Sequence, residues 1–325
     1  MFKKSVICVV SLALAAVFTL NTGQAQAAER QFVSIAAGWV TGAYFPMAGA
    51  ISRIAFNNLK DDNIKVTAES SGASVANANL IASGNTDFAI LQNDVASYAY
   101  NGKEGMFDTP VKNLLGCASL YPEHIQIIVR KDSGIESVAD LKGKRVAVGP
   151  IGSGTTVNAE QILSAWDISF DDFQAEQLQA RQAADYIKDG RLDAAFFTVA
   201  VGAAAIKDIA TVVDIDVLDI VGPKAQQLLD EYPFYTQQPV PAGSYPGLEE
   251  DSTTIAVMAI MAARKELDSD LVYKIMKAMY TNLDRIKEAH AKFQDISVEN
   301  ALDGMTLPLH PGAEKYLKEV AVVKE

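Results

Sequence analysis

The chain has 325 residues, of which 49% are hydrophobic, and 28 basic residues stand against 40 acidic ones for a formal net charge of −12. A chain of this length buries roughly three quarters of its unfolded surface, so a globular protein of one or two domains is expected. The acidic balance argues against nucleic acids and anionic membrane surfaces as partners, since both would repel it.

The first 27 residues have the three parts of a secretory signal peptide. Two lysines, Lys3 and Lys4, precede an apolar run at 6–20, and Ala-Gln-Ala at 25–27 supplies the small residues of a cleavage site. The apolar run is shorter than the about 20 residues that span a bilayer. We therefore predict export to the periplasm, cleavage after Ala27, and no membrane insertion of the mature chain.

Cleavage at that point changes both charge and cysteine content. It removes two lysines and no acids, so 26 basic residues minus 40 acidic ones give −14. Cys117 is then the one cysteine left, so no disulfide within the chain is possible, and its setting predicts a small buried apolar side chain. An anionic ligand would gain nothing from long-range attraction and would have to be captured locally.

The mature chain alternates short apolar strands with amphipathic helices. This pattern is typical of α/β proteins built around a largely parallel sheet. Strands are expected at 32–37, 64–69, 87–91, 125–130, 145–148, 193–198 and 253–261. Helices are expected from 43–44, at 75–82 and 95–100, from the 150s to about 166, at 203–210 and 269–290, and after 310–312.

Five of these strands lead into helices through short polar or glycine-containing loops. The loops lie at 38–42, 70–74, 92–94, 149–156 and 199–202. Ligands of open α/β sheets bind beyond the carboxyl ends of the strands, where these loops should meet. We therefore expect a shared pocket for a small polar molecule.

The loop within 146–159 is the most informative of the five. It follows a buried strand and offers Ser153, Gly154, Thr155 and Thr156 at a helix start, where unpaired N–H groups and the helix dipole favour an anion. The alternative is an ordinary turn with Ser153 or Thr155 as N-cap. The loop is no P-loop, because Gly154 is not followed by lysine, so neutral donors would do the capture.

Composition also suggests where domains meet. The densest Pro/Gly stretch, 238–247, predicts one crossover between domains, and 121–132 predicts the other. The resulting division is a signal peptide at 1–27, a first lobe at 28–126, a second lobe at 127–239, and a return to the first lobe at 240–325.

An ordered set of short motifs resembles the TAXI family, the extracytoplasmic solute receptors of one class of TRAP transporter. No single motif is specific, but their order is. They include Gly-Ala-Tyr-Phe-Pro at 42–46, Ser-Gly-Ala-Ser-Val-Ala-Asn at 71–77 and the segment 88–96. Further matches lie at 119–123, 132–135, 140–146, 152–155 and 241–247.

This resemblance implies a two-lobed periplasmic binding protein of type II-like fold. Each lobe would be a central sheet flanked by helices, joined by a two-segment hinge near 121–132 and 238–247. The ligand would be a carboxylate such as glutamate, glutamine or 2-oxoglutarate, delivered to TRAP membrane subunits. Two segments depart from the family pattern, Gly-Ala-Ser at 72–74 and Ala-Val-Gly at 200–202.

The residues expected to bind the ligand come from the five loops and helix starts. Two roles stay open: Tyr44 could line the cleft or pack in the core, and Asp94 could be a first-turn acid or the partner of a ligand ammonium. The predicted set is Gly42, Tyr44, Ser71, Gly72, Ser74, Gln92, Asp94, Ser153, Gly154, Thr155, Thr156 and Val199.

The sequence shows no motif for catalysis, a cofactor or a metal site. His124, His290 and His310 have no metal-ligand spacing and are expected to be solvated or capping. Ser153 lacks the Gly-x-Ser-x-Gly setting of a hydrolase nucleophile. We predict a binding protein; the alternatives are a receptor domain for a membrane sensor kinase and, less favoured, an exported enzyme on the same fold.

Overall fold

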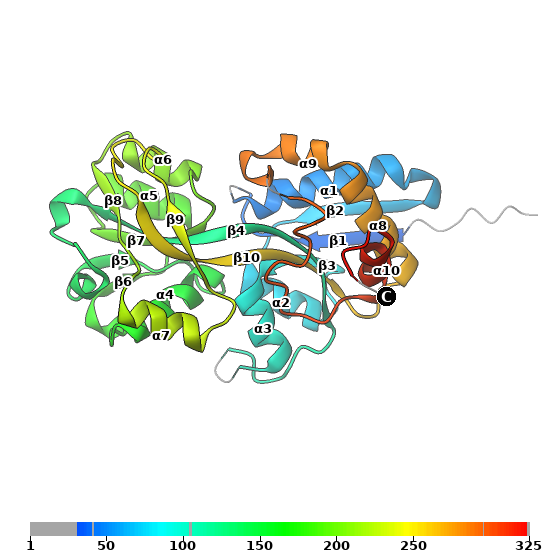
Figure 1. The fold of residues 1–325 in the computed structure, drawn as a ribbon, viewed down its shortest axis with the longest axis horizontal. Helices are drawn as coiled ribbons and strands as arrows, with labels where there is room; N and C mark the ends of the chain where they lie inside the picture. Colours follow the sequence, from blue (N-terminus) through cyan, green and yellow to red (C-terminus); the bar gives the residue numbers. More distant parts are fainter. Residues whose placement is uncertain (1–30, 41, 104–105, 295, 324–325) are drawn as a thin grey trace, which may run out of the picture.

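The computed structural model describes residues 31–40, 42–103, 106–294 and 296–323. The expected signal peptide lies outside these residues. Two lobes stand side by side, and two long strands, β4 (Leu114–Arg130) and β10 (Ser252–Arg264), run from one lobe into the other (Figure 1). In the described part of the chain, no helix combines the length and apolar character needed to cross a bilayer.

The other strands are short. They are β1 (Gln31–Ala36), β2 (Ile64–Glu69), β3 (Phe88–Gln92), β5 (Arg145–Ala147), β6 (Gln174–Glu176), β7 (Ala194–Val199), β8 (Ile215–Val217) and β9 (Thr236–Val240). The α-helices are α1 (Tyr44–Asn58), α2 (Ser74–Ala82), α3 (Asn93–Asn101), α4 (Gly154–Ala165), α5 (Ala180–Lys188), α6 (Ala204–Ala210), α7 (Pro223–Glu231), α8 (Ser269–Thr281), α9 (Leu283–Ala289) and α10 (Pro311–Glu319). Short 3-10 turns include η3 (Val138–Leu141) and η5 (Ala291–Phe293).

One mixed sheet is shared by both lobes. Its strand order is β2-β1-β3-β10-β4-β7-β5-β6, with β8 beside β4 and β9 beside β10. The outer strands of each lobe pair in parallel, whereas β10 is antiparallel to both β3 and β4. The carboxyl ends of β1, β2 and β3 therefore meet at one edge, facing those of β5 and β7 in the second lobe.

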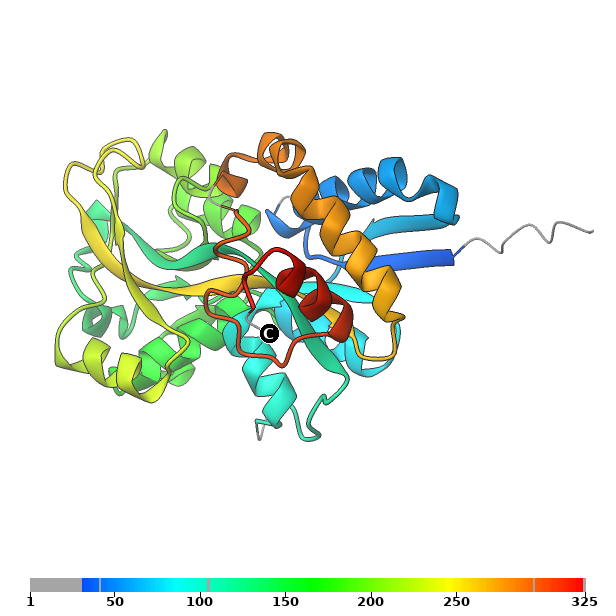
Figure 2. The ribbon, with the colours of Figure 1, turned by 45° about the vertical axis from the view of Figure 1, so that its right-hand side comes forward.

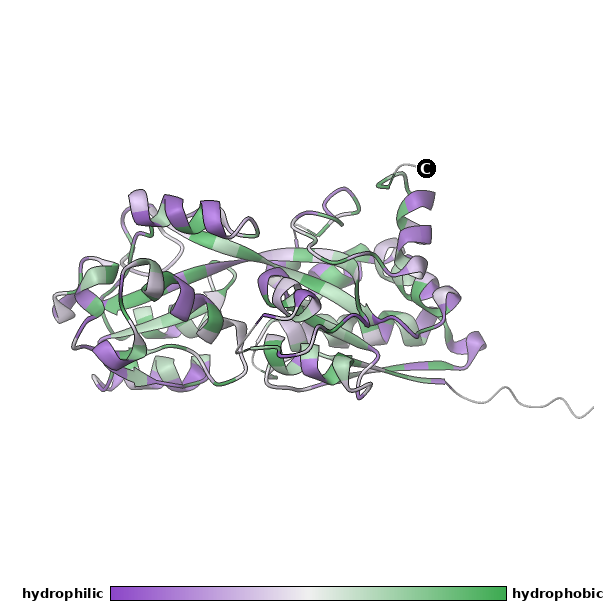
Figure 3. Ribbon diagram, turned by 90° about the horizontal axis from the view of Figure 1, so that it is seen from below, coloured by the Kyte–Doolittle hydropathy of each residue, from purple (hydrophilic) through white to green (hydrophobic). Residues whose placement is uncertain are grey.

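Each face of the sheet is covered by helices and carries its own apolar core. In the first lobe, α1, α8 and α10 cover one face and α2 and α3 the other. In the second lobe, α4 and α7 lie opposite α5 and α6. The strands are mostly apolar and the outer helix surfaces polar, as expected for a sheet covered on both sides (Figure 3).

Most predicted elements exist, with ends shifted by one or two residues. The strand expected at 125–130 is the last part of β4, which begins 11 residues earlier at Leu114. The helix expected at 269–290 is broken at Asn282, whose φ of −126° and ψ of 33° leave the helical region. The result is two helices, α8 and α9.

The second crossover lies elsewhere than the Pro/Gly stretch at 238–247. That stretch holds the end of β9 and the turn into β10, where Gly243 and Gly247 adopt φ of 75° and 77°. The apolar cores change over between Val257 and Ala259 within β10, and between Tyr121 and Ile125 within β4. The density of Pro and Gly marked a turn, while the chain passes between lobes as continuous strand.

The carboxyl-terminal helix α10 packs closely on α8 in the first lobe (Figure 2). Gly312, at the start of α10, lies against the backbone of α8. A Cβ at this position would overlap the Ser269 carbonyl oxygen and lie 2.8 Å from Val272 Cβ and 2.9 Å from the Tyr273 nitrogen. Backbone atoms cannot rotate away, so the two helices would have to separate.

We expect Gly312→Ala to lower the free energy of unfolding by about 1–3 kcal/mol, the usual effect of overpacking. Gly49→Ala in α1 is the matched control, because its Cβ would meet nothing closer than 3.6 Å and alanine favours a helix. Urea denaturation of both variants checks the prediction. A Gly312→Ala protein as stable as the wild type would contradict the packing described here.

Candidate functional site

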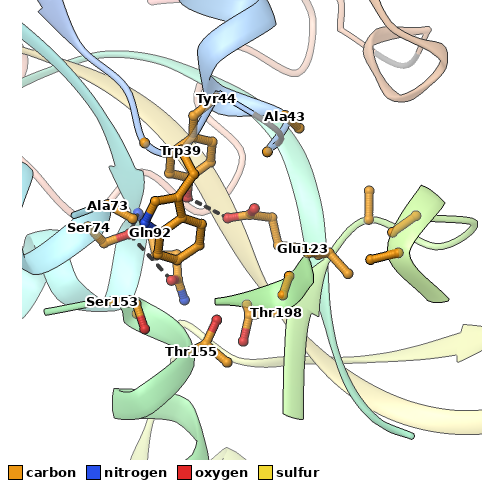
Figure 4. A pocket seen from close by; sticks show the side chains of 18 of the residues that line it. Trp39, Ala43, Tyr44, Ala73, Ser74, Gln92, Glu123, Ser153, Thr155 and Thr198 are labelled. Atoms are coloured by element: carbon orange, nitrogen blue, oxygen red, sulfur yellow. Dashed lines mark hydrogen bonds between the residues drawn. The ribbon is translucent and has the colours of Figure 1, made fainter. Parts of the chain in front are cut away.

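A cavity of about 130 Å³ lies between the two lobes, at the edge where the loops meet. Its wall comes from the loops after β1, β2 and β3, the starts of α4 and α5, the end of β7, and the segment around η5. Figure 4 shows Tyr44 and Glu123 on one side of it and Ser153, Thr155 and Thr198 on the other, with Trp39 and Gln92 between.

The start of α4 is a helix N-terminus capped by a side chain. Ser153 has the extended conformation of an N-cap, with φ −94° and ψ 155°, and its Oγ accepts from the Thr156 nitrogen at 3.3 Å. Ser153, Gly154 and Thr155 all face the cavity. The two readings of the sequence are thus compatible, because Ser153 caps the helix and still lines the cavity. A 12-residue helix directs its positive dipole end toward this space.

Gln92 links the two lobes at the floor of the cavity. Its Nε2 donates to Asn158 Oδ1 in α4 at 2.7 Å, and its Oε1 accepts from Ser74 Oγ at 3.3 Å. The amide lies so close to Gly154 that a Cβ there would overlap it. Thr198 Oγ1 also donates to Asn158 Oδ1, at 2.9 Å.

Asp94 belongs to this interlobe network and does not line the cavity. Its carboxylate accepts from the Val95 nitrogen and, at 2.7 Å, from Asn158 Nδ2. Burial raises the pKa of Asp94 to about 6. Of the two roles left open by the sequence, the structure shows a buried first-turn acid engaged with protein groups.

The start of α2 also makes contacts between the lobes. The backbone nitrogens of Val75 and Ala76 donate to the Gly152 carbonyl oxygen of the second lobe, at 3.2 and 3.3 Å. Ser71 Oγ donates to Asn77 Oδ1 at 2.5 Å. The second helix start expected to hold the anion is therefore engaged with the opposite lobe, and only Ser74 and Ala73 of this loop reach the cavity.

Glu123 is the acidic side chain in the cavity wall, and sequence reasoning missed it. It is 6% exposed, and its Oε2 accepts from Tyr44 Oη at 2.6 Å. Burial, and then the nearby Asp94, raise the pKa of Glu123 to about 8 against the lowering effect of Tyr44. The residue stood at the end of a family-like motif and just before the expected strand, so only the length of β4 could have indicated its position.

A lysine side chain also lines the cavity, in addition to the neutral donors expected from the sequence. Lys292 and His290 line it from the segment after α9.

Two of the three histidines cap helices, as predicted. His290 Nδ1 accepts from the Lys292 backbone nitrogen at 3.2 Å and caps η5, and His310 Nδ1 caps α10. His124 is neither capping nor solvated: it is 9% exposed within β4, and burial lowers its pKa to about 4.

The predicted site residues divide into two groups. Eight line the cavity: Gly42, Tyr44, Ser74, Gln92, Ser153, Gly154, Thr155 and Val199. Four do not, namely Ser71, Gly72, Asp94 and Thr156, whose polar groups or backbone serve protein contacts. Contact of the eight with a ligand stays a prediction.

Tyr44 and Cys117 can be placed against their predictions. Tyr44 both lines the cavity and packs in the first-lobe core, so its two readings hold together. Cys117 is fully buried, as predicted, and burial raises the pKa of its thiol. Within the residues that the structure describes, no group of three or more His, Cys, Asp or Glu side chains is arranged to hold a metal ion.

The NMT1-like family model matches residues 35–320, and the chain belongs to this family. Among similar solved structures is PhnD1 from Prochlorococcus marinus in complex with methylphosphonate, at 11% identity and TM-score 0.57, covering 90% of this chain and 100% of that one. Another is a putative sulfonate ABC transporter's periplasmic sulfonate-binding protein, SsuA from Methylobacillus flagellatus, at 15% identity and TM-score 0.52, covering 90% and 96%. A third is a putative L-cystine ABC transporter protein from Listeria monocytogenes, at 15% and 0.52, covering 82% and 98%.

These findings establish the two-lobed α/β periplasmic-binding-protein fold and correct the family expectation. The matching family is NMT1-like, and the similar structures are described as binding proteins of ABC transporters, so the TAXI assignment and the TRAP membrane subunits that it implied are not supported. The short motifs that suggested TAXI were too unspecific to define the family or the transporter class.

Ala73 is strained, and the strain can be measured. Its φ of 72° and ψ of −150° lie in a region that is essentially confined to glycine and costs about 1–3 kcal/mol for other residues. We expect Ala73→Gly to raise the free energy of unfolding by about 1 kcal/mol after allowing for the greater chain entropy of glycine. Ala76→Gly, inside α2, should instead lower it by a similar amount. Denaturant unfolding of both variants provides the test, and a loss of stability in Ala73→Gly would contradict the backbone conformation.

The buried carboxyl of Glu123 predicts a pH dependence of stability. Unfolded glutamate loses its proton near pH 4.5, whereas folded Glu123 keeps it to about pH 8, so the folded state binds more protons between these values. Stability from this group is therefore lost as the pH rises. From pH 7 to 8 the wild type should lose about 1 kcal/mol relative to Glu123→Gln, since one pKa unit corresponds to about 1.4 kcal/mol. Histidine and Asp94 contributions are common to both proteins; parallel pH profiles would argue against a proton on buried Glu123.

Proposed function

We propose that this protein is a periplasmic solute receptor that captures a small organic anion, a carboxylate, between its lobes and presents it to the membrane subunits of a transporter. The observation that carries the proposal is the meeting of the α4 N-terminus and Lys292 in one small cavity between two lobes. The expected signal peptide supports the location.

The start of α4 supplies what a carboxylate needs. Its first N–H groups lack partners within the helix, and the positive end of the helix dipole favours a negative charge. Ser153 is almost fully buried and Thr155 is half-buried, so hydrogen bonds made there compete little with water. Lys292 adds a positive charge to the same cavity. A protein with an acidic overall balance needs such local attraction to hold an anion.

The connection between the lobes supports capture by closure. Among the described residues, β4 and β10 run through the apolar cores of both lobes, so bending at two strand positions would move one lobe against the other. A ligand that contacts both lobes binds the closed form better and shifts the population toward it. The loaded receptor then differs in shape from the empty one, which a membrane partner can recognise.

PhnD1 was solved with methylphosphonate, an anion, on this same fold.

A screen of small carboxylates by thermal shift tests the ligand class. At 100 times its dissociation constant a ligand stabilises the folded state by about 2.7 kcal/mol. The panel should contain monocarboxylates, dicarboxylates and amino acids at matched ionic strength, with methylphosphonate and a sulfonate for comparison. If no carboxylate raises the melting temperature, the ligand class proposed here is wrong.

Substitution at α4 tests the location of the site. Ser153→Ala combined with Thr155→Val removes two hydroxyls from the cavity wall and should weaken binding by about 1–3 kcal/mol, measured by calorimetry with the carboxylate found in the screen. Ser137→Ala is the matched control, because Ser137 caps η3 through its hydroxyl away from the cavity. It should lose stability similarly but bind normally. Unchanged affinity in the double variant would place the anion elsewhere.

A further inference from the structure

The cavity wall contains an acidic side chain, Glu123, that has no role in binding an anion. Glu123 lies in the wall of a site whose other side favours negative charge. We propose that Glu123, held by Tyr44, is the specificity-determining residue that receives a primary ammonium group, so that the ligand is a small amino acid bound by its carboxylate at α4 and its ammonium at Glu123. This inference rests on the proposed function.

Tyr44 positions the carboxyl group. Its Oη donates to Glu123 Oε2 at 2.6 Å, which leaves Oε1 without a partner among the printed contacts of the described residues. Both side chains line the cavity, and both are almost fully buried, at 7% and 6% exposed. In Figure 4 the Glu123 carboxyl group is directed toward the Tyr44 hydroxyl, and Ser153 and Thr155 lie on the other side of the cavity. A ligand with groups of opposite charge fits this arrangement.

The charge environment of Glu123 favours an amino acid over a carboxylic acid without an amino group. None of the ion pairs in the described part of the chain involves Glu123. An ionised carboxylate that is buried without a cation is costly, and an ammonium group supplies both the charge and strong hydrogen bonds. A ligand without an ammonium group leaves the Glu123 carboxyl protonated and gains no ion pair from it. The raised pKa of Glu123 is consistent with a missing cationic partner.

Two neighbouring charged groups do not take this role. Asp94 lies off the cavity wall, and both of its carboxylate oxygens accept hydrogen bonds from protein nitrogens. Lys292 carries a positive charge and therefore cannot receive an ammonium group; with His290 it lines the same cavity as Glu123. Tyr44 and Tyr121 also interact with Glu123, and both are un-ionised at neutral pH because burial raises their pKa values.

The experiment compares acids that differ only in the amino group. Isothermal titration calorimetry of the full mature protein is performed with L-glutamate and glutarate, L-alanine and propionate, and glycine and acetate. In at least one pair the amino acid should bind at least tenfold more tightly. Glu123→Gln should weaken that amino acid by tenfold or more and leave the paired acid unchanged or tighter. Glu249→Gln, a matched change at an exposed glutamate, should bind as the wild type does.

A second measurement needs no variant and therefore stands even if Glu123→Gln fails to fold. Binding of an ammonium group at Glu123 drives its proton off, so titrations of the wild type at pH 7.5 in buffers of different ionisation enthalpy should show proton release with the amino acid and none with the paired acid. Tighter binding of the deaminated acids, an amino-acid preference retained by Glu123→Gln, or equal proton release within a pair would each overturn the inference while leaving an anion receptor intact. Absence of binding by every compound would overturn the proposed function itself.

Discussion

The arrangement of this protein depends on the contact of two lobes through Asn158. Its amide accepts from Gln92 and Thr198 and donates to Asp94, so one buried side chain of α4 joins the ends of β3, α3 and β7. Buried polar groups are costly when unpaired, and this network pairs them only when the lobes meet. The same contact places Ser153, Thr155 and Gln92 around a single cavity. The polar contact between the lobes and the wall of the cavity therefore depend on the same side chains.

The shared sheet connects the two lobes and leaves each lobe with its own apolar clusters. The apolar clusters of both lobes end on the continuous strands β4 and β10, and Val157 of α4 packs across the division into a first-lobe cluster. A register shift between Ala259 and Ile260 lies close to the point where the cores change over. Irregular strand pairing locally weakens a ladder, so bending there disturbs few apolar contacts.

The polar groups that line the cavity differ from one side of it to the other. One side presents the start of α4, and the other presents a carboxyl group oriented by Tyr44; Lys292 also lines the cavity. In a space of about 130 Å³ these groups lie close enough to act on the same small molecule. The strain at Ala73, a residue of the cavity wall, shows that the loop conformation here is imposed by its surroundings and not by local preference.

Local sequence patterns determined most of the secondary structure, the α/β class and the loops that surround the cavity, because period, glycine placement and helix capping act over a few residues. They correctly indicated the α4 start, Tyr44, Ser74 and Gln92 as residues near one edge of a sheet. They could not indicate Glu123, Lys292 or Thr198, since these reach the cavity through strand pairing and chain crossing at long range. The second crossover between the lobes was misplaced for the same reason. Pro and Gly indicate local turns, whereas the passage of a continuous strand from one lobe to the other is visible only in the folded sheet. The tertiary structure decided which groups face each other across the cavity, because the charge and burial of one side chain depend on others far away in the chain.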